Sequence, residues 1–157
     1  MNVTIYTDGA CAGNPGVGGY AAILVCNGQE RIVRGCMSEI VTNNKMELKA
    51  IVEALNWINK VQKAPCELEI HTDSKYIIDC ATGKDKDGSK RKIGWFKGRK
   101  NEDLWMEFIT QTLKGKHKIK FVKVKGHSGD LMNERCDRIA KEECVKAKHK
   151  LVEKEIL

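Results

Sequence analysis

The chain lacks any long apolar run. No stretch approaches the roughly 18 consecutive apolar residues of a membrane-spanning helix, and the N-terminus has no apolar signal region. We therefore expect a soluble protein with no membrane partner. The sequence also has no internal repeat, linker or low-complexity segment, and its 157 residues fit one domain. This predicts a single domain over residues 1–148, followed by a helix extension or a tail at 149–157.

The cysteines form no C-x-x-C pair, and their number, seven, is odd. Both features argue against a disulfide framework and against a zinc ribbon, and they favour a reducing compartment. The expected location is therefore the cytoplasm. Because the sequence offers no second domain, we expect a free-standing monomer without an obligate protein partner.

Acidic residues are fewer than basic ones, 21 against 28, which gives a formal net charge of +7. The excess is concentrated at residues 84–100, where eight basic residues accompany two acidic ones. A local cationic patch on a soluble protein favours a polyanionic partner, most often a nucleic acid. A solvated lysine-rich loop is the alternative, and charge alone leaves it open.

The order of the predicted elements favours an α/β fold. Alternating apolar residues predict a first strand over residues 2–8, and Asn27-Gly28 predicts a two-residue hairpin between strands at 19–26 and 30–37. The other predicted elements are a helix at 45–61, a strand at 67–73, a short helix after Ser74, a helix at 101–113, a strand at 119–124 and a helix at 133–148. This order predicts a mixed sheet with helices packed on it.

Four acidic residues occupy unusual positions. Asp8 and Asp73 end predicted strands. Glu47 lies on the apolar face of a predicted helix, and Asp137 lies close to the apolar face of the last one. Asp8 also suits a plain turn and Asp73 a plain helix N-cap, so each alone has an ordinary explanation. An acid on the core side of a helix, however, is costly unless something compensates its charge.

Carboxylates that approach one another repel, and cations between them relieve the repulsion. Hard oxygen ligands suit Mg²⁺ or Mn²⁺, which also take waters and phosphate oxygens. Two such ions about 4 Å apart activate a water and stabilise the leaving oxygen of a phosphoryl displacement. The acids and the basic segment therefore favour a metal-dependent site that acts on a nucleic acid, provided that the fold brings the acids together.

Four motifs closely resemble type 1 ribonuclease H of the bacterial kind. They are YTDGACAGNPG at 6–16, TNNKMELKA at 42–50, HTDSKY at 71–76 and VKGHSGDLMNERCDRIA at 124–140, in the order and at the spacing of that family. The resemblance implies the ribonuclease H-like fold, a five-stranded mixed sheet in the order 3-2-1-4-5 with strands 1–3 antiparallel. It also implies endonucleolytic hydrolysis of the RNA strand of RNA–DNA hybrids by two Mg²⁺ ions, for which Mn²⁺ can substitute, leaving 5′-phosphate and 3′-hydroxyl ends.

The resemblance extends to individual site residues. It implies four metal-binding acids and a loop histidine for proton transfer or product release, at Asp8, Glu47, Asp73, Asp137 and His127. Glu47 also matches a contact to the ribose 2′-hydroxyl, which distinguishes RNA from DNA. The implied hybrid contacts are minor-groove residues at Asn14, Asn43 and Asn44, and DNA-strand phosphate contacts at Thr42 and Asn101. Gly9 joins the substrate-binding set, because a glycine beside Asp8 lets a ligand backbone come close.

Three positions depart from the family pattern. Lys75 stands where a glutamine is frequent; lysine cannot read a base edge as an amide does, but it can meet a phosphate or a 2′-hydroxyl. The basic segment is shorter than the tryptophan-rich handle of bacterial members, and Trp95 is its clearest substrate-binding candidate. Ile40 replaces a frequent arginine two residues before Thr42. These departures predict a weaker or differently shared hybrid affinity and leave catalysis intact.

Three other functions compete with this interpretation. A DNA-strand transferase or junction nuclease would share the fold, but Asn43, Asn44 and the motif at 124–140 match the hybrid-cleaving branch. A binding module without catalysis conflicts with the presence of all four acids. Nucleotide binding through the glycines at 13–19 fails, because they lead into a strand, whereas a dinucleotide fingerprint opens a helix.

Overall fold

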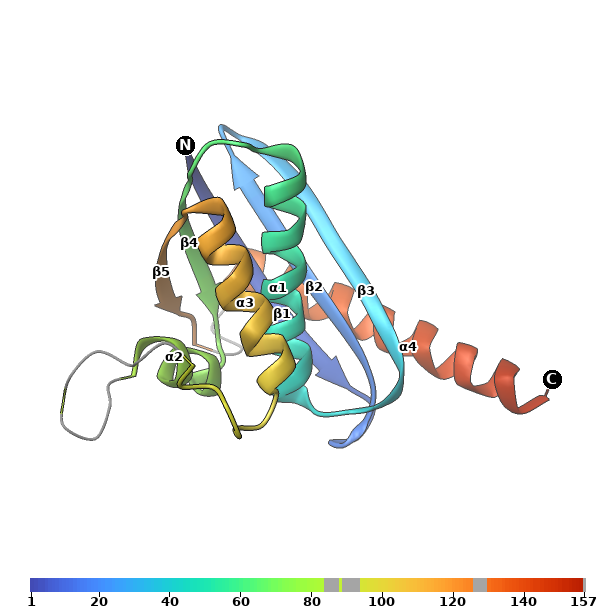
Figure 1. Ribbon diagram of the computed structural model, residues 1–157. Helices are drawn as coiled ribbons and strands as arrows, with labels where there is room; N and C mark the ends of the chain where they lie inside the picture. Colours follow the sequence, from blue (N-terminus) through green and yellow to red (C-terminus); the bar gives the residue numbers. More distant parts are fainter. Residues whose placement is uncertain (84–87, 89–93, 126–129, 157) are drawn as a thin grey trace.

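Helices cover both faces of one central sheet in the computed structural model, which describes residues 1–83, 88, 94–125 and 130–156 (Figure 1). The elements in chain order are β1 (Asn2–Cys11), β2 (Gly16–Cys26), β3 (Gln29–Val41), α1 (Asn43–Val61), β4 (Glu67–Thr72), α2 (Lys75–Thr82), α3 (Glu102–Gly115), β5 (Lys118–Lys123) and α4 (Leu131–Ile156). In Figure 1, α1 and α3 lie in front of the sheet, and α4 crosses behind it and extends past β3.

The sheet has five strands in the order β3-β2-β1-β4-β5. β1, β2 and β3 pair antiparallel, whereas β4 pairs parallel with β1, and β5 parallel with β4. Asn27 and Gly28, which form the β2–β3 turn, both have positive φ, as a two-residue hairpin of this kind requires. The parallel pairs need crossover connections, and these contain the helices α1, α2 and α3. The predicted mixed sheet and its strand order are confirmed.

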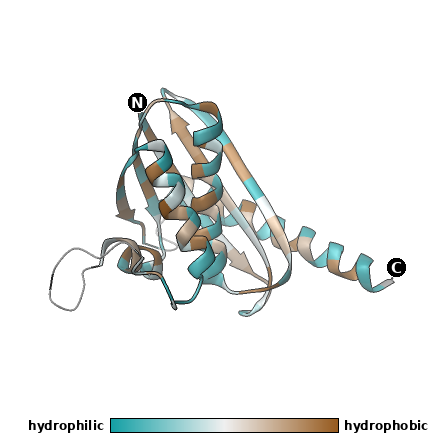
Figure 2. Ribbon diagram, in the orientation of Figure 1, coloured by the Kyte–Doolittle hydropathy of each residue, from teal (hydrophilic) through white to brown (hydrophobic). Residues whose placement is uncertain are grey.

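Two apolar clusters hold the three layers together, one on each face of the sheet. Along β2, Ala22 and Leu24 belong to the cluster shared with α1 and α3, whereas Ala21 and Ile23 belong to the cluster shared with α4. Because both of its faces are covered, β2 is buried along most of its length. Figure 2 shows mostly hydrophobic residues on β2, and a mixture of hydrophobic and hydrophilic residues along the helices that cover it.

The close packing of α4 on the sheet depends on a glycine in β2. A Cβ atom at Gly19 would lie 2.3 Å from the carbonyl oxygen of Ala140 and 2.6 Å from the backbone nitrogen of Cys144. An ion pair of 2.8 Å between Arg34 and Glu143 also ties α4 to β3. These contacts determine where α4, the helix that carries one of the predicted acids, lies against the sheet.

β1 continues past the point where the sequence predicts its end. The strand includes Asp8 and runs to Cys11, because its pairing with β2 continues through Asp8↔Ala21 and Cys11↔Gly18. Its parallel pairing with β4 stops earlier, at Tyr6↔His71. The expectation that Asp8 ends its strand is therefore wrong: Asp8 lies within β1, two residues beyond the last parallel pair. β3 is also longer than predicted, because its pairing with β2 extends to Gly16↔Val41.

α4 is longer than the helix predicted at 133–148. Its 26 residues run to Ile156 and include nearly all of the segment at 149–157. Despite that length, neither α4 nor any other helix in the described part of the chain is apolar enough to cross a membrane. All seven cysteines of the chain are free thiols.

Candidate active site

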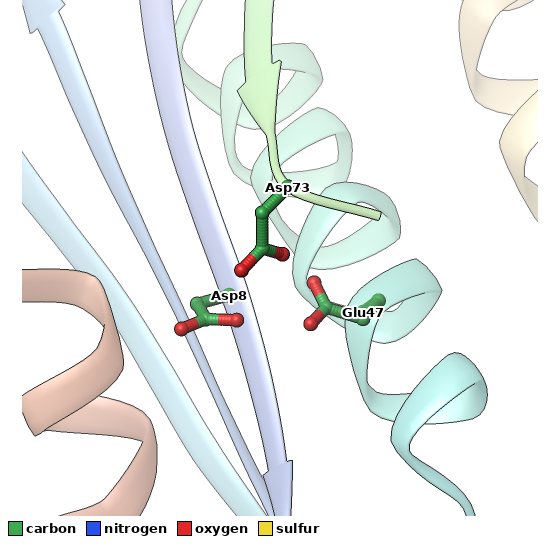
Figure 3. A group of neighbouring side chains, drawn as sticks. All are labelled: Asp8, Glu47 and Asp73. Atoms are coloured by element: carbon green, nitrogen blue, oxygen red, sulfur yellow. The ribbon is translucent and has the colours of Figure 1, made fainter. Parts of the chain in front are cut away.

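Three carboxylates from three different elements converge near the C-terminal ends of the neighbouring strands β1 and β4. Asp8 belongs to β1, Glu47 to the N-terminal part of α1, and Asp73 directly follows β4. One oxygen of each carboxylate lies within 4.8 Å of the others. In Figure 3 the three side chains point toward a common centre. The structure therefore brings together three of the four acids that the sequence singled out.

Strand register and a glycine explain this convergence. The last parallel pair, Tyr6↔His71, precedes both Asp8 and Asp73 by two residues, so both side chains emerge at the same place on the sheet. α1 packs directly on Gly9, where an added Cβ would lie 2.5 Å from the backbone nitrogen of Glu47. Gly9, predicted as a substrate-binding residue, thus has a packing role that brings Glu47 close to Asp8.

Burial makes this acidic cluster electrostatically costly. The exposed fractions of Asp8 and Glu47 are only 5% and 8%. Burial raises the pKa of Asp8 to about 7, and repulsion by Asp73 and Asp137 contributes further. Burial, followed by the charge of Asp8, also raises the pKa of Glu47 well above its usual value. One oxygen of Glu47, Oε2, is buried without a hydrogen-bond partner.

The residues of this cluster fit a hard divalent cation. Carboxylate oxygens are the ligands that Mg²⁺ and Mn²⁺ prefer, and a cation among these acids would relieve the repulsion that raises their pKa values. It would also give the unpartnered Oε2 atom of Glu47 a partner. Asp8, Glu47 and Asp73 are therefore able to hold a metal ion.

Asp137 faces the same pocket from α4. The pocket has a volume of about 310 Å³, and all four acids line it. Asp137 lies outside the group of three close carboxylates and forms a 2.9 Å ion pair with Nζ of Lys141. Its charge nevertheless contributes to the raised pKa of Asp8. The predicted catalytic residue His127 lies outside the described residues.

The predicted minor-groove residues and the predicted phosphate contact Thr42 gather around the N-terminus of α1. Thr42 caps this helix, and its hydroxyl oxygen accepts the backbone N–H of Lys45 at 3.2 Å. The backbone N–H of Asn43 donates to Oδ1 of Asn14 at 3.1 Å, which ties the segment after β1 to the helix. Asn14, Thr42, Asn43 and Asn44 are all exposed, and Asn43 also lines the acidic pocket.

The predicted contacts at Lys75 and Trp95 lie outside the lining of the acidic pocket. Lys75 is exposed and forms a 2.8 Å ion pair with Asp79, one turn further along α2. Trp95 is half-buried, and its ring centroid lies 5.1 Å from that of Trp105. Trp95 therefore has a packing role, and its contact with a substrate stays a prediction.

The end of the basic segment at 84–100 leads into α3. Lys97, Arg99 and Lys100 are exposed, whereas residues 84–87 and 89–93 lie outside the described part of the chain. Asn101 follows as the residue before α3, and its side-chain Nδ2 donates to the hydroxyl of Tyr76 at 3.1 Å. The Asn101 side chain is thus hydrogen-bonded to a residue of α2, and its contact with a phosphate stays a prediction.

Comparison with known proteins agrees with this geometry. The model of the RNase H family matches residues 1–145. Ribonuclease H of Caldicellulosiruptor saccharolyticus is 46% identical over 143 residues, covering 88% of this chain and 93% of the relative. Ribonuclease H of Erythrobacter litoralis is 44% identical over 144 residues, covering 89% and 94%. The chain belongs to the ribonuclease H family.

Solved ribonuclease H structures share the fold of this family member. LC9-RNase H1, a type 1 RNase H with the type 2 active-site motif, superposes with a TM-score of 0.75 at 27% identity, covering 93% of this chain and 73% of that one. LC11-RNase H1, solved in complex with an RNA/DNA hybrid, superposes with a TM-score of 0.71 at 21% identity, covering 92% and 98%. Because the identity to LC11-RNase H1 is only 21%, that likeness supports the fold alone. The predicted ribonuclease H fold and the assignment to this class of nucleases are confirmed.

The residues of this ribonuclease H pocket that the sequence analysis did not name as site residues include Asn133, Glu134 and Lys141. Asn133 is buried and lines the pocket, as does Lys141, the ion-pair partner of Asp137. Asn133 and Lys141 lie four residues before and four residues after Asp137, so all three share one face of α4. This helical spacing is the sequence signal that identifies them.

Proposed function

We propose that this ribonuclease H hydrolyses the RNA strand of RNA–DNA hybrids with two Mg²⁺ ions, leaving 5′-phosphate and 3′-hydroxyl ends. The observation that carries this proposal is the convergence of Asp8, Glu47 and Asp73 in a pocket that Asp137 also lines. The unpartnered buried oxygen of Glu47 supports a cation at that place. Family membership supplies the reaction class.

In this proposal each acid has a defined role. Asp8, Glu47, Asp73 and Asp137 would hold the two ions, with Asp8 contributing to both positions, Glu47 and Asp73 to one, and Asp137 to the other. The chemistry that Mg²⁺ would supply when bound here is water activation and stabilisation of the leaving oxygen. The backbone N–H of Gly9 donates to Oδ1 of Asp8 at 2.9 Å and holds this carboxylate in orientation. His127 assists proton transfer or product release.

Five of the proposed hybrid contacts, Asn14, Thr42, Asn43, Asn44 and Lys75, are exposed. The amides of Asn14, Asn43 and Asn44 offer both donors and acceptors to the minor groove, and Glu47 meets the ribose 2′-hydroxyl. The exposed basic residues before Asn101, namely Lys97, Arg99 and Lys100, attract phosphates of the hybrid. The full set of proposed substrate-binding residues is Gly9, Asn14, Thr42, Asn43, Asn44, Lys75, Trp95 and Asn101.

A strand-specific cleavage assay tests the proposal. One short hybrid, labelled on either strand, is incubated with the protein and Mg²⁺, alongside duplex DNA, duplex RNA and an EDTA control. We expect cleavage of only the hybrid's RNA strand, loss of cleavage in EDTA, and no detectable cleavage by Asp8→Asn, which removes a metal-binding carboxylate. Glu107→Gln, at an exposed carboxylate on α3, is the matched control and should cleave at the parental rate.

Each competing function gives a different result in the same assay. Parental cleavage by Asp8→Asn would contradict the metal assignment. Equal cleavage of duplex DNA and hybrid would favour a junction nuclease. Hybrid binding without cleavage, in Mg²⁺ and in Mn²⁺, would favour a binding module. Terminal analysis of the products tests the predicted 5′-phosphate and 3′-hydroxyl ends.

A further inference from the structure

The hydroxyl of Tyr76 joins α2 to three residues at the start of α3, beside the proposed substrate-binding surface. It accepts hydrogen bonds from Nδ2 of Asn101 at 3.1 Å and from Nε1 of Trp105 at 3.0 Å. It donates its own proton to the carbonyl oxygen of Lys100 at 3.3 Å. A phenolic hydroxyl has one proton to donate and two lone pairs that accept, so this group uses its full bonding capacity.

Tyr76 is itself held in a fixed place relative to the acids. It lies in the first turn of α2, whose N-cap residue, Ser74, directly follows Asp73. The hydroxyl oxygen of Ser74 accepts the backbone N–H of Ile77 at 3.2 Å, which secures this turn. On its other side, the Tyr76 ring lies 6.1 Å from the ring of the fully buried Trp105. The turn that follows Asp73 therefore fixes the place of Tyr76 relative to the acids.

Asn101 has a backbone conformation that makes this side-chain bond important. Its φ is 63°, in the left-handed region, and its side chain makes no capping hydrogen bond to α3. Among residues other than glycine, asparagine is one of the few that are enriched in this conformation. The carboxamide is instead bonded to the Tyr76 hydroxyl. A carboxamide has two N–H donors, so the group that Tyr76 orients also has a second donor with which to meet a phosphate oxygen.

We propose that Tyr76 is a positioning residue for hybrid binding: its hydroxyl orients the Asn101 carboxamide and holds the Lys100 backbone, so that both residues meet one DNA-strand phosphate at a set distance from the acids. The inference rests on the proposed function, in which Asn101 contacts that phosphate. Tyr76 needs no contact with the substrate for this role. In Figure 1 the yellow segment before α3 leads from beside α2 to the start of α3.

Tyr76→Phe tests the role directly, because it removes the hydroxyl and keeps the ring against Trp105. We expect KM for the hybrid to rise about two- to tenfold, the range that one net hydrogen bond corresponds to. The hybrid Kd, measured in EDTA by fluorescence anisotropy, should rise by the same factor. The value of kcat should stay parental, since the acids are untouched. Asn101→Ala should raise KM by at least as much, and adding Tyr76→Phe to it should raise KM no further.

Trp105→Phe is the matched control for a purely structural effect. It removes the indole N–H that donates to the same hydroxyl and leaves the bond between Tyr76 and Asn101 in place. This variant should lower Tm and leave KM and Kd parental. An increase in KM equal to that of Tyr76→Phe would overturn the positioning role, as would parental KM and Kd in Tyr76→Phe, or full additivity with Asn101→Ala.

The same measurements separate this inference from the proposed function. If Asn101→Ala leaves KM and Kd unchanged while the parent cleaves the RNA strand, the phosphate contact and the role of Tyr76 are wrong and the proposed function stands. If the parent binds the hybrid without cleaving it, the proposed function is wrong. The Kd values of Tyr76→Phe, Asn101→Ala and Trp105→Phe then still decide whether Tyr76 positions Asn101.

Discussion

Replacing Asp8 by asparagine should stabilise the metal-free protein at neutral and alkaline pH. In EDTA, folding buries Asp8 beside two other carboxylates, and its pKa rises from 3.8 to about 7. An acid whose pKa is higher in the folded state binds more protons there, so the free energy of unfolding falls as the pH rises between the two pKa values. The loss begins near pH 4 and is complete above about pH 7. Asparagine carries no charge and avoids this loss.

The size of the effect follows from the two pKa values. A difference from 3.8 to about 7 corresponds to roughly 4 kcal/mol at pH 8. This is an upper value, because Glu47 shares the repulsion. We expect Asp8→Asn to raise the free energy of unfolding by about 2 to 4 kcal/mol. In a domain of this size, that gain raises Tm by roughly 4 to 16 °C. Near pH 4 it should almost vanish.

Thermal unfolding in EDTA between about pH 4 and pH 8 measures this difference. Parent, Asp8→Asn and the exposed control Glu107→Gln are followed by circular dichroism. The Tm of the parent should fall relative to that of Asp8→Asn as the pH rises, and Glu107→Gln should follow the parent. Added Mg²⁺ should raise Tm more in the parent than in Asp8→Asn, because a ligand that binds only the folded state stabilises it. Parallel Tm profiles for parent and Asp8→Asn would refute the reasoning.

Two further predictions concern packing and a buried histidine. Gly9→Ala should push α1 away from β1, because its Cβ would lie 2.5 Å from the backbone nitrogen of Glu47. We expect the free energy of unfolding to fall by about 1–3 kcal/mol and Mg²⁺ binding, measured by titration calorimetry, to weaken. Parental Mg²⁺ affinity would contradict this. His117 is buried, with Nδ1 accepting the Cys66 N–H at 3.1 Å and Nε2 lying 2.6 Å from Oδ1 of Asn59. Burial lowers the pKa of His117, so the folded state favours neutral imidazole and the parent should lose stability as the pH falls below the usual histidine value of about 6.5. Urea unfolding at pH 7 and pH 5 should show a smaller pH dependence in His117→Gln, and an equal dependence would rule this explanation out.

Local sequence patterns predicted most of the elements, because each depends on neighbours along the chain. The hairpin at Asn27-Gly28 needs only two residues that tolerate positive φ, and Thr42 caps α1 through a residue three positions away. Boundaries that depend on a distant partner were predicted less well. β1 continues through Asp8 because β2 pairs with it there, and no residue near Asp8 indicates that pairing.

The features of the candidate site likewise divide into those predicted from the sequence and those that depend on distant contacts. Strand and helix patterns singled out the four acids, residue type made them suitable metal ligands, and motif resemblance implied the same four positions. Resemblance did not indicate that Gly9 is needed for the approach of Glu47, nor that Trp95 packs on Trp105. The link from Tyr76 to Asn101 joins α2 to the start of α3 across 25 residues of sequence, and it depends on where the fold places these two segments.

The sequence by itself determined the family, the strand order that the family implies, and the identity of the acidic residues, because these follow from residue type and from spacing along the chain. Tertiary structure alone decided which carboxylates meet, how deeply they are buried and therefore that the pKa of Asp8 rises to about 7. The physical reason is that Coulomb repulsion and desolvation depend on distance and on access to water. Both quantities are set by β1–β4 register and by the packing of α1 on Gly9.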